Sequence, residues 1–328
     1  MQPQCDVESL PPPALQGATF DDTPDKAIRL RCPVCLGHIS QLNCRQCGLT
    51  LSVERGIVRA LTPQRAEHYA RFIEDYERIR DAEGRGSESD EFYLGLPYRD
   101  ATGKHSDQWR IRSCSYVCLM EEIFGMAMPS AARILDLGAG NGWLSFRLAM
   151  AGYSPVAVDL LTNERDGLEA AEHFRGHLRP LFPRFQAELG NLPFQDGQFD
   201  AAVFNASFHY TEDEEGTLRE AFRCVKKEGL VVLCDSPWYS SEEGGRQMVA
   251  ERRAQFRRSY GTDSASLQSI EYLTDERLSR MKERLSIRWS RYSPSYGLRW
   301  EMRPVVARLR RRREPARFRI YVAQRCSA

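Results

Sequence analysis

The chain has 328 residues, and a prior of about 150 residues per domain predicts roughly two domains. Hydrophobic residues make up 42% and charged residues 28%, which is typical of globular proteins and excludes a wholly disordered or collagen-like chain. Lysine and arginine number 46 against 45 acidic residues, a net charge of +1. This balance implies no chain-wide affinity for nucleic acid or acidic membranes, but it leaves a local basic patch open.

Residues 1–27 are acidic and contain Pro11, Pro12 and Pro13. They have neither the positive start nor the apolar run of a signal peptide, and no segment approaches the roughly 20 apolar residues of a membrane helix. We therefore interpret residues 1–27 as a disordered leader. The expected location is the cytoplasm, with reduced thiols and no membrane partner.

Four of the cysteines have metal-ligand spacing, C-x2-C-x8-C-x2-C: Cys32, Cys35, Cys44 and Cys47. Two CxxC turns predict a zinc ribbon over residues 28–61, in which the metal replaces a core that so short a segment cannot build. Four sulfur ligands leave no open position, so the predicted zinc is structural and not catalytic. Two disulfides or unrelated thiols are the alternative, and a reducing compartment disfavours the disulfides.

Residues 62–130 have helical character with one interruption. A polar, helix-favouring stretch covers 63–81, a Gly/Ser/acid-rich break at 83–90 is interpreted as a linker, and apolar residues return at helical spacing over 107–124. We expect a helical linker or cap.

From residue 131 to 328 strands and helices alternate, which predicts an α/β domain. The strands are nearly continuous apolar runs, which favours a parallel sheet covered on both faces. Helices are expected over 143–151, over 163–178 and after Thr211. Strands are expected at 134–138, 155–159, 185–189, 199–204 and 229–234, with two last strands at 287–292 and 318–324.

A glycine loop, Asp136-Leu-Gly138-Ala-Gly140-Asn-Gly142, lies between the first of these strands and the helix after it. Such glycines let a backbone approach a ligand closely at a helix N-terminus. The third glycine follows the second by two residues, whereas the dinucleotide fingerprint G-x-G-x-x-G has three. A ligand without a pyrophosphate suits this variant.

Two acidic residues end the next two predicted strands. Asp159 comes 23 residues after Asp136, where an acidic side chain can accept both hydroxyls of a ribose. Glu188 ends the third strand and can sit near an adenine edge. The alternatives are a capping acid for Asp159 and a surface charge for Glu188, but their order and placement together favour a binding site.

Residues 131–236 resemble the class I S-adenosylmethionine (SAM)-dependent methyltransferases. The matching segments are Ile134 to Gly142, Val156 to Asp159, Glu188 to Phe194, Phe199 to Asn205 and Arg223 to Leu233. The resemblance implies a Rossmann-like, seven-stranded, mostly parallel sheet, SAM as cofactor, and an enzyme that transfers a methyl group. It also implies cofactor contacts: Asp136, Gly138, Gly140 and Gly142 for the methionine part, Asp159 for the ribose, Glu188 and Leu189 for the adenine, Asn205 after the fourth strand, and Arg110 or Arg112 for the carboxylate.

The four-cysteine unit looks like the Trm112-type or zinc-ribbon segments found beside methyltransferases. Ribosomal RNA guanine methyltransferases also carry an N-terminal zinc site, but their pattern has a histidine where this chain has Cys47. That departure weakens the case for an rRNA substrate.

The residues after the fourth strand face the methyl group in the resembled family, and here they include His209 and Tyr210. His209 is predicted to act as a base or to orient the acceptor, or else to pack at a helix entrance. Tyr210 is predicted to be catalytic or an aromatic wall. Because residues 205–210 hold neither a [DNS]-P-P-[YFW] motif nor a cysteine, an oxygen or nitrogen of a small molecule is the favoured acceptor.

Two alternatives stay open. Residues 299–319 contain nine arginines and two glutamates, including Arg310 to Arg313, and such a cluster can bind phosphates or be a solvated face. With the zinc ribbon it keeps an RNA base methyltransferase as the second hypothesis. A non-catalytic SAM-binding or scaffold protein is the third. The oligomeric state is not predicted.

Overall fold

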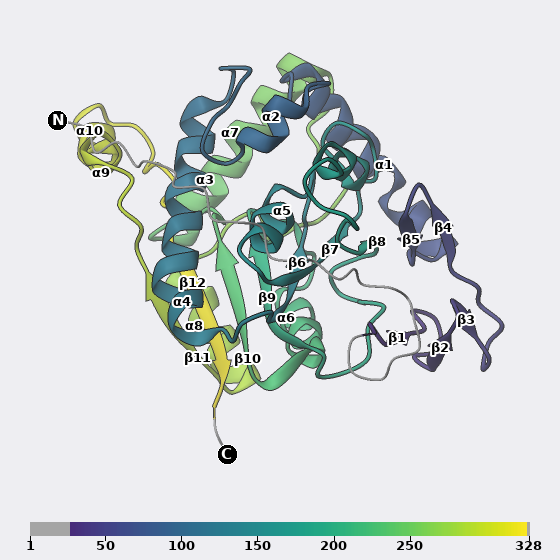
Figure 1. The fold of residues 1–328 in the computed structure, drawn as a ribbon. Helices are drawn as coiled ribbons and strands as arrows, with labels where there is room; N and C mark the ends of the chain where they lie inside the picture. The colour runs from purple at the N-terminus through teal and green to yellow at the C-terminus, as the bar shows by residue number, and fades with distance from the viewer. Residues whose placement is uncertain (1–26, 327–328) are drawn as a thin grey trace.

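The computed structural model describes residues 27–326, so the predicted leader falls outside the described residues except for its last position. A large sheet has the strand order β11-β12-β10-β9-β6-β7-β8-β5-β4, and a small three-stranded sheet lies beside it (Figure 1). The six strands from β10 to β5 run parallel, and β4, β11 and β12 are antiparallel to their neighbours. This architecture confirms the predicted Rossmann-like, mostly parallel α/β fold.

The strand bounds follow the predicted runs closely in the main sheet. They are β4 (Ser52–Glu54), β5 (Ile57–Arg59), β6 (Arg133–Leu137), β7 (Ser154–Asp159), β8 (Arg184–Gln186), β9 (Phe199–Asn205), β10 (Val225–Cys234), β11 (Ile287–Tyr292) and β12 (Ile320–Arg325). The small sheet consists of β1 (Leu30–Arg31), β2 (His38–Ser40) and β3 (Asn43–Cys44).

The predicted count of seven strands is wrong, because β4 and β5 add two more to the main sheet. Both come from the segment predicted as the zinc ribbon, and β5 pairs in parallel with β8, with Val58 opposite Phe185. Ile57 and Val58 are fully buried in this position. Three-residue strands are too short for an alternating pattern to reveal them, and their apolar side chains find their core in the larger sheet.

Helices cover both faces of the sheet and the edge where its parallel strands end. Their bounds are α1 (Pro63–Ala82), α2 (Asp90–Gly95), α3 (Ser106–Cys118), η1 (Leu119–Phe124), α4 (Gly125–Ala127), α5 (Trp143–Met150), η2 (Leu168–Phe174), η3 (Phe208–Tyr210), α6 (Glu214–Cys224), α7 (Glu242–Tyr260), α8 (Asp275–Leu285), α9 (Leu298–Glu301) and α10 (Arg303–Leu309).

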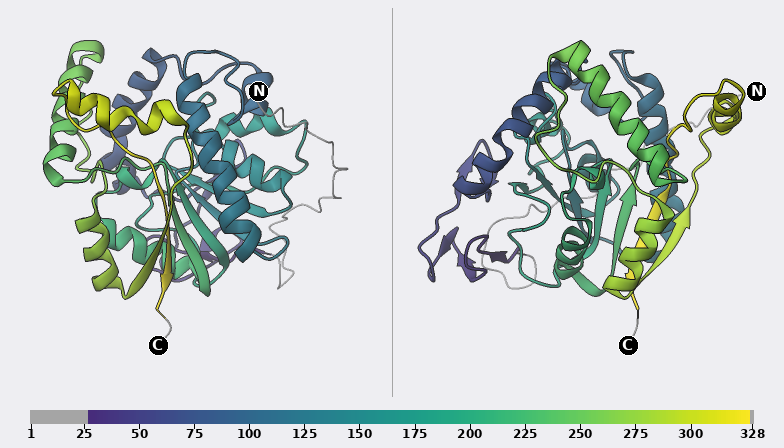
Figure 2. Two further views of the ribbon diagram at one scale, coloured as in Figure 1. Left: turned by 90° about the vertical axis from the view of Figure 1, so that its left-hand side faces the viewer. Right: turned by 180° about the vertical axis from the view of Figure 1, so that it is seen from behind.

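The core has two layers, one on each face of the sheet. On one face, α6, α8 and the small sheet pack against alternate strand residues such as Leu135 and Phe204. On the other face, α2, α3, α5 and η2 pack against the intervening residues such as Ile134 and Val203. The α1 and α7 helices cross above the carboxyl ends of the strands (Figures 1 and 2), so α1 covers the edge where the glycine loop lies.

Two predicted helices differ from the structure. The helix expected over 163–178 is only the short 3-10 segment η2, because the Asn163 side chain accepts hydrogen bonds from the amides of Arg165 and Asp166 and holds a turn there. The helix expected over 107–124 is α3 followed by a π-helical turn, η1. Within residues 27–326, no helix has the length and apolar content needed to cross a bilayer.

Candidate cofactor site and cysteine cluster

The glycine loop connects β6 to α5 at the carboxyl edge of the sheet. The amides of Gly138 and Ala139 both donate to the carbonyl of Val158, which fixes the loop against β7. Gly138 has φ +76°, and a Cβ added there would lie 2.2 Å from the Cβ of Ser207. Only glycine fits this position, because the turn after β9 fills the space that a side chain would need.

A cavity opens to solvent beside this loop. The structure brings eight of the predicted site residues to its lining. They are Arg112, Asp136, Gly138, Gly140, Asp159, Leu189, Asn205 and Tyr210. Gly142, Glu188 and His209 do not line it.

Two carboxylates, the buried Asp136 and the half-buried Asp159, stand on the cavity wall in different environments. Both oxygens of Asp159 accept backbone amides, from Gly140 at 2.7 Å and from Leu161 at 2.8 Å. The Oδ2 of Asp136 accepts from the Ser145 hydroxyl at 2.7 Å, whereas its Oδ1 finds no hydrogen-bond donor among residues 27–326. Burial raises the pKa of Asp136 to about 7 and that of Asp159 to about 6. Asp136 therefore presents an unused acceptor to the cavity.

Arg112 on α3 is a half-buried cation on the wall of the cavity. Its guanidinium lies 4.7 Å from the centre of the Trp109 ring, and no carboxylate forms an ion pair with it in the described part of the chain. Burial, together with the like charges of Arg80 and Arg85, lowers its pKa to about 10. An unpaired, half-buried cation is costly, so the site is suited to an anionic group of a ligand.

The α1 helix supplies lining residues that the sequence analysis did not assign: Phe72, Tyr76 and Arg80. Tyr76 and Tyr210 meet edge to face with ring centres 5.6 Å apart, and Arg80 forms an ion pair with Asp166, which also lines the cavity. Phe72, Tyr76 and Arg80 are spaced i, i+4, i+8, and this spacing is the one sequence pattern that could have placed them on a single face of α1. Helical spacing alone does not tell a cavity wall from a core face.

Glu188 lies in an adjoining cavity and is tied to α1. It forms an ion pair with Arg65 at 2.7 Å and accepts a hydrogen bond from the Tyr69 hydroxyl. Leu189 lines both cavities, together with Leu160 after β7. The predicted adenine contacts therefore lie where the two cavities meet, and the charge of Glu188 is balanced within the protein.

The two other predicted residues lie behind the wall. Gly142 begins α5 and faces Phe182, whose ring would be 3.0 Å from an added Cβ. The ring of His209 is buried and lies tilted against Tyr210, with ring centres 4.3 Å apart. Its Nδ1 lies 3.5 Å from the Ser236 hydroxyl. Burial, with Arg252 and Arg112 nearby, lowers the pKa of His209 to about 3. This geometry favours the packing role that the sequence left open, and it gives His209 no access to an acceptor.

The four cysteines of the N-terminal unit form a single cluster. Their sulfur atoms all lie within 4.8 Å of one another, with Cys32 and Cys47 3.5 Å apart and Cys35 and Cys44 3.4 Å apart. These separations exceed the roughly 2.05 Å of a disulfide and approach the roughly 3.8 Å between sulfurs of a tetrahedral zinc site. The donor set therefore fits the predicted zinc.

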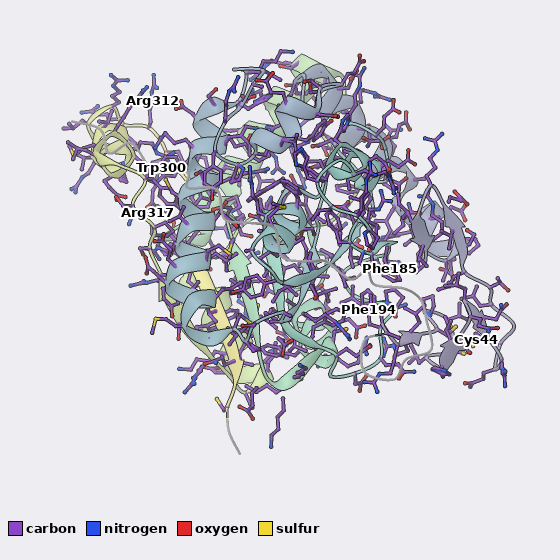
Figure 3. The ribbon with its side chains drawn as sticks, in the orientation of Figure 1. Cys44, Phe185, Phe194, Trp300, Arg312 and Arg317 are labelled. Carbon is purple, nitrogen blue, oxygen red and sulfur yellow. The ribbon has the colours of Figure 1, made fainter. Side chains whose placement is uncertain are left out.

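The cysteine cluster is attached to the segment between β8 and β9. Leu30 bridges Phe194 in antiparallel fashion, Asn191 donates to the carbonyl of Pro33, and Arg31 pairs with Glu220 at 2.9 Å. Phe185 on β8 and Phe194 belong to the same buried cluster as Cys44, and Figure 3 shows both on the side of the molecule where Cys44 lies. Because Glu188 and Leu189 begin this segment, the cysteine unit supports one wall of the two cavities from behind.

Comparison with known proteins finds matches for the central part of the chain. A family model described as a methyltransferase domain matches residues 135–233, which include the glycine loop, both acids and the strands β6 to β10. A putative methyltransferase, YqeM of Bacillus subtilis, is 31% identical over 111 residues, which are 33% of this chain and 43% of that protein. The demethylmenaquinone methyltransferase of Streptomyces avermitilis is 33% identical over 106 residues, or 32% of this chain and 42% of its own. The chain thus spans less than half the length of these relatives.

Solved structures of similar architecture also include methyltransferases. A putative methyltransferase in complex with the Haloferax volcanii Trm112 activator has 16% identity and a TM-score of 0.45, with 74% of this chain and all of that chain covered. The YcgJ protein of Bacillus subtilis has 17% identity and a TM-score of 0.44, with 63% and 98% covered.

Proposed function

We propose that this chain, which carries a class I SAM-dependent methyltransferase domain over residues 135–233, transfers a methyl group from SAM to an oxygen or nitrogen atom of a small molecule. The observation that carries the proposal is a pair of unsatisfied, oppositely charged groups on one cavity wall. Asp136 offers a free carboxylate oxygen, and Arg112 offers a half-buried guanidinium without an ion-pair partner among the described residues.

This pair is complementary to the amino-acid part of SAM. An α-ammonium would satisfy the Oδ1 of Asp136, and an α-carboxylate would satisfy Arg112. Gly138 and Gly140 line the cavity between these two groups, and without side chains they let the backbone approach the ligand closely. Asp159 then stands ready for the ribose hydroxyls, and Leu160 and Leu189 supply apolar surfaces for a base.

The protein's role in such a reaction is alignment. Bound SAM would supply an electrophilic methyl group, so the residues around it need to bind, orient and exclude water. Tyr76, Tyr210 and Phe72 form an aromatic wall beside Asn205 at the cavity, where the acceptor would lie. We propose Tyr210 as part of this wall, and we assign no proton transfer to His209.

Two observations support a small acceptor over RNA. Two of the relatives are named for demethylmenaquinone and arsenite, neither of which is a macromolecule. In addition, the two parts expected to hold RNA, the cysteine unit and the arginine-rich segment, lie at opposite ends of the molecule, as Cys44 and Arg312 show in Figure 3. An RNA contacting both would have to span the whole protein.

We propose structural zinc as the second bound group, held by Cys32, Cys35, Cys44 and Cys47. Its role would be to hold the cysteine unit against the segment 191–195, and through that segment to keep Leu189 in place. Four sulfur ligands leave no position for a substrate, so the metal would take no part in methyl transfer.

The test is to follow a labelled methyl group. The purified chain is incubated with methyl-labelled SAM and, separately, with a small-molecule extract and with total RNA, and the products are separated by size. Label in the small-molecule fraction, lost in Asp136→Asn, is the expected result. Label in RNA would replace the small acceptor with the second hypothesis, and SAM binding without any labelled product would favour the non-catalytic third.

A further inference from the structure

The arginine-rich segment forms a separate projection from the fold. We call residues 298–313, which comprise α9, α10 and the four residues after them, the basic lobe. Figures 1 and 2 show it standing beside α3, away from the sheet. It contains seven arginines and one glutamate, a net charge of +6 in a chain whose total is +1.

The basic lobe presents an apolar stripe outward. Leu298, Met302, Val305 and Leu309 follow one another at spacings of four, three and four residues, which places them on one helical face. Their exposed fractions are 78%, 44%, 49% and 79%. One exposed leucine is ordinary, but four large apolar residues at helical spacing along α9, Met302 and α10 mark an interaction surface.

The arginines of the segment 299–319 fall into two groups. Arg313, Arg317 and Arg319 pair with acidic residues, and Arg303 lies over the Trp300 ring at 3.3 Å and donates to a carbonyl. The other five are exposed and have no ion pair within residues 27–326: Arg299, Arg308, Arg310, Arg311 and Arg312. All five of these free cations lie in the basic lobe.

The basic lobe is firmly anchored at its base, so its exposed stripe is not the result of loose packing. Trp300 turns inward and stacks on Phe318 with ring centres 5.5 Å apart. Just before α9, the hydroxyl of Tyr296 lies 2.9 Å from that of Ser115 on α3, and Arg110 donates to the Tyr296 carbonyl at 2.8 Å. The aromatic residues hold the lobe in place, and the aliphatic residues are left outside.

We propose that the basic lobe binds the surface of an anionic lipid bilayer. A helix with an aliphatic face flanked by arginines lies in the interfacial plane, with the apolar side chains in the acyl boundary and the guanidiniums at the lipid phosphates. This surface role goes beyond the proposed methyl transfer and requires no helix to span the bilayer. It differs from the sequence-based expectation of no membrane partner, which rested on the net charge of the whole chain and on the lack of an apolar run long enough to cross a bilayer.

The stripe distinguishes a lipid surface from RNA. Arginines contact the phosphates of both, but proteins that hold single-stranded RNA add exposed aromatic rings on which bases stack. The one aromatic side chain of the basic lobe, Trp300, stacks on Phe318 and is covered by the Arg303 guanidinium, so its ring is not free to stack on a base. Exposed leucines and valines gain nothing from phosphates, whereas transfer to an acyl boundary removes their surface from water.

The test is flotation of the full chain with vesicles of phosphatidylcholine alone and of phosphatidylcholine with phosphatidylglycerol. The proposal expects binding to the anionic vesicles only, weakening as salt is raised. The triple variant R310Q/R311Q/R312Q should bind on the order of 100-fold more weakly, since each basic residue at an anionic surface contributes about fivefold. The variant L298S/L309S should lose at least tenfold. The control R219Q/R258Q/R291Q removes three exposed arginines outside the basic lobe and should stay within about threefold.

Three outcomes would overturn the proposal. The first is no flotation of the wild-type chain with anionic vesicles at low salt. The second is vesicle binding that L298S/L309S leaves unchanged while the wild type binds RNA tightly and with steep salt dependence, which would assign the arginines to nucleic acid. The third is a wild-type dimer that L298S/L309S converts to a monomer, which would make a second copy the occupant. SAM affinity, measured on each variant without vesicles, checks folding and is independent of these results.

Discussion

The cavity and the basic lobe both hold arginines without ion pairs among the described residues, but the two environments give those arginines opposite meanings. Arg112 is enclosed between Trp109 and the cavity, where burial lowers its pKa to about 10. Arg310, Arg311 and Arg312 stand in solvent. A half-buried cation depends on a specific anion in one place, whereas exposed cations are stable alone and attract any large anionic surface. The same residue type therefore indicates a small ligand in one region and an extended partner in the other.

The largest expected effect is on SAM affinity, and it tests whether binding in the cavity, unlike binding by the basic lobe, depends on tight packing of the protein around the site. Gly138→Ala places a Cβ 2.2 Å from that of Ser207, so the loop must shift and SAM affinity should fall more than 100-fold in calorimetric titration. Gly152→Ala is the matched control, because it has the same kind of backbone, φ +88°, with nothing within 4 Å of the added atom. It should lose only about 1–2 kcal/mol of stability and no affinity. Equal affinities in the two variants would remove Gly138 from the site.

The second prediction compares the two arginine groups directly. Arg112→Gln should weaken SAM binding about 10- to 100-fold, since a charge-assisted hydrogen bond is worth roughly 1.5–3 kcal/mol. The basic-lobe variant R310Q/R311Q/R312Q should bind SAM within about twofold of the wild type. Fluorescence or calorimetric titration of both proteins checks this, and a larger loss in the basic-lobe variant than in Arg112→Gln would reverse the assignment.

The third prediction concerns pH. Burial raises the pKa of Asp136 to about 7, so its carboxylate forms only as the pH rises through that value, and SAM affinity should increase about tenfold between pH 6 and pH 8. The folded chain keeps a proton that the unfolded chain releases above about pH 4, so this group lowers stability as the pH rises from 4 to 7.

The variant Asp136→Asn separates these two effects. Without SAM it should raise the melting temperature at pH 8, because a buried charge is removed, yet it should lose the pH dependence of SAM binding. A variant that melts like the wild type at pH 8 and still binds more tightly as the pH rises would show that another group titrates.

The smallest expected effect comes from the cysteine unit, which supports the cavity only indirectly. Removal of the metal by a chelator, or Cys44→Ser, should lower the melting temperature by about 5–10 °C and weaken SAM binding a few-fold. Vesicle binding by the basic lobe at the other end should not change. Cys326→Ser, which alters an exposed cysteine outside the cluster, is the control and should match the wild type. Metal analysis that finds no zinc in the untreated protein would contradict the proposed ligand set.

The local features of the site could be predicted from the sequence, because residues that are close together in the chain define them. Asp136, Gly138 and Gly140 lie within five residues of a strand that ends in glycines, and Asp159 ends the following strand. Parallel strands bring their carboxyl ends to one edge, so these residues meet without further information. The cysteine spacing is local in the same sense.

Features that depend on distant packing were not accessible. Arg80 meets Asp166 across 86 residues, and nothing in the stretch around Arg80 shows that α1 crosses above the strand ends. The β5 strand is three residues long and is defined by its partner β8. The sequence also could not show that the apolar stripe of the basic lobe is exposed, because the helical spacing of apolar residues is the same for a covered face and for a solvent-exposed one.

The central claim, that the cavity between Asp136 and Arg112 holds SAM, is tested most directly by calorimetric titration of the purified chain with SAM at pH 8. The account predicts saturable binding of one SAM per chain, with a dissociation constant between about 1 μM and 1 mM, the usual range for enzyme substrates. It also predicts that this binding weakens in both Asp136→Asn and Arg112→Gln while both variants stay folded. No saturable binding up to about 1 mM, or unchanged affinity in both folded variants, would contradict it.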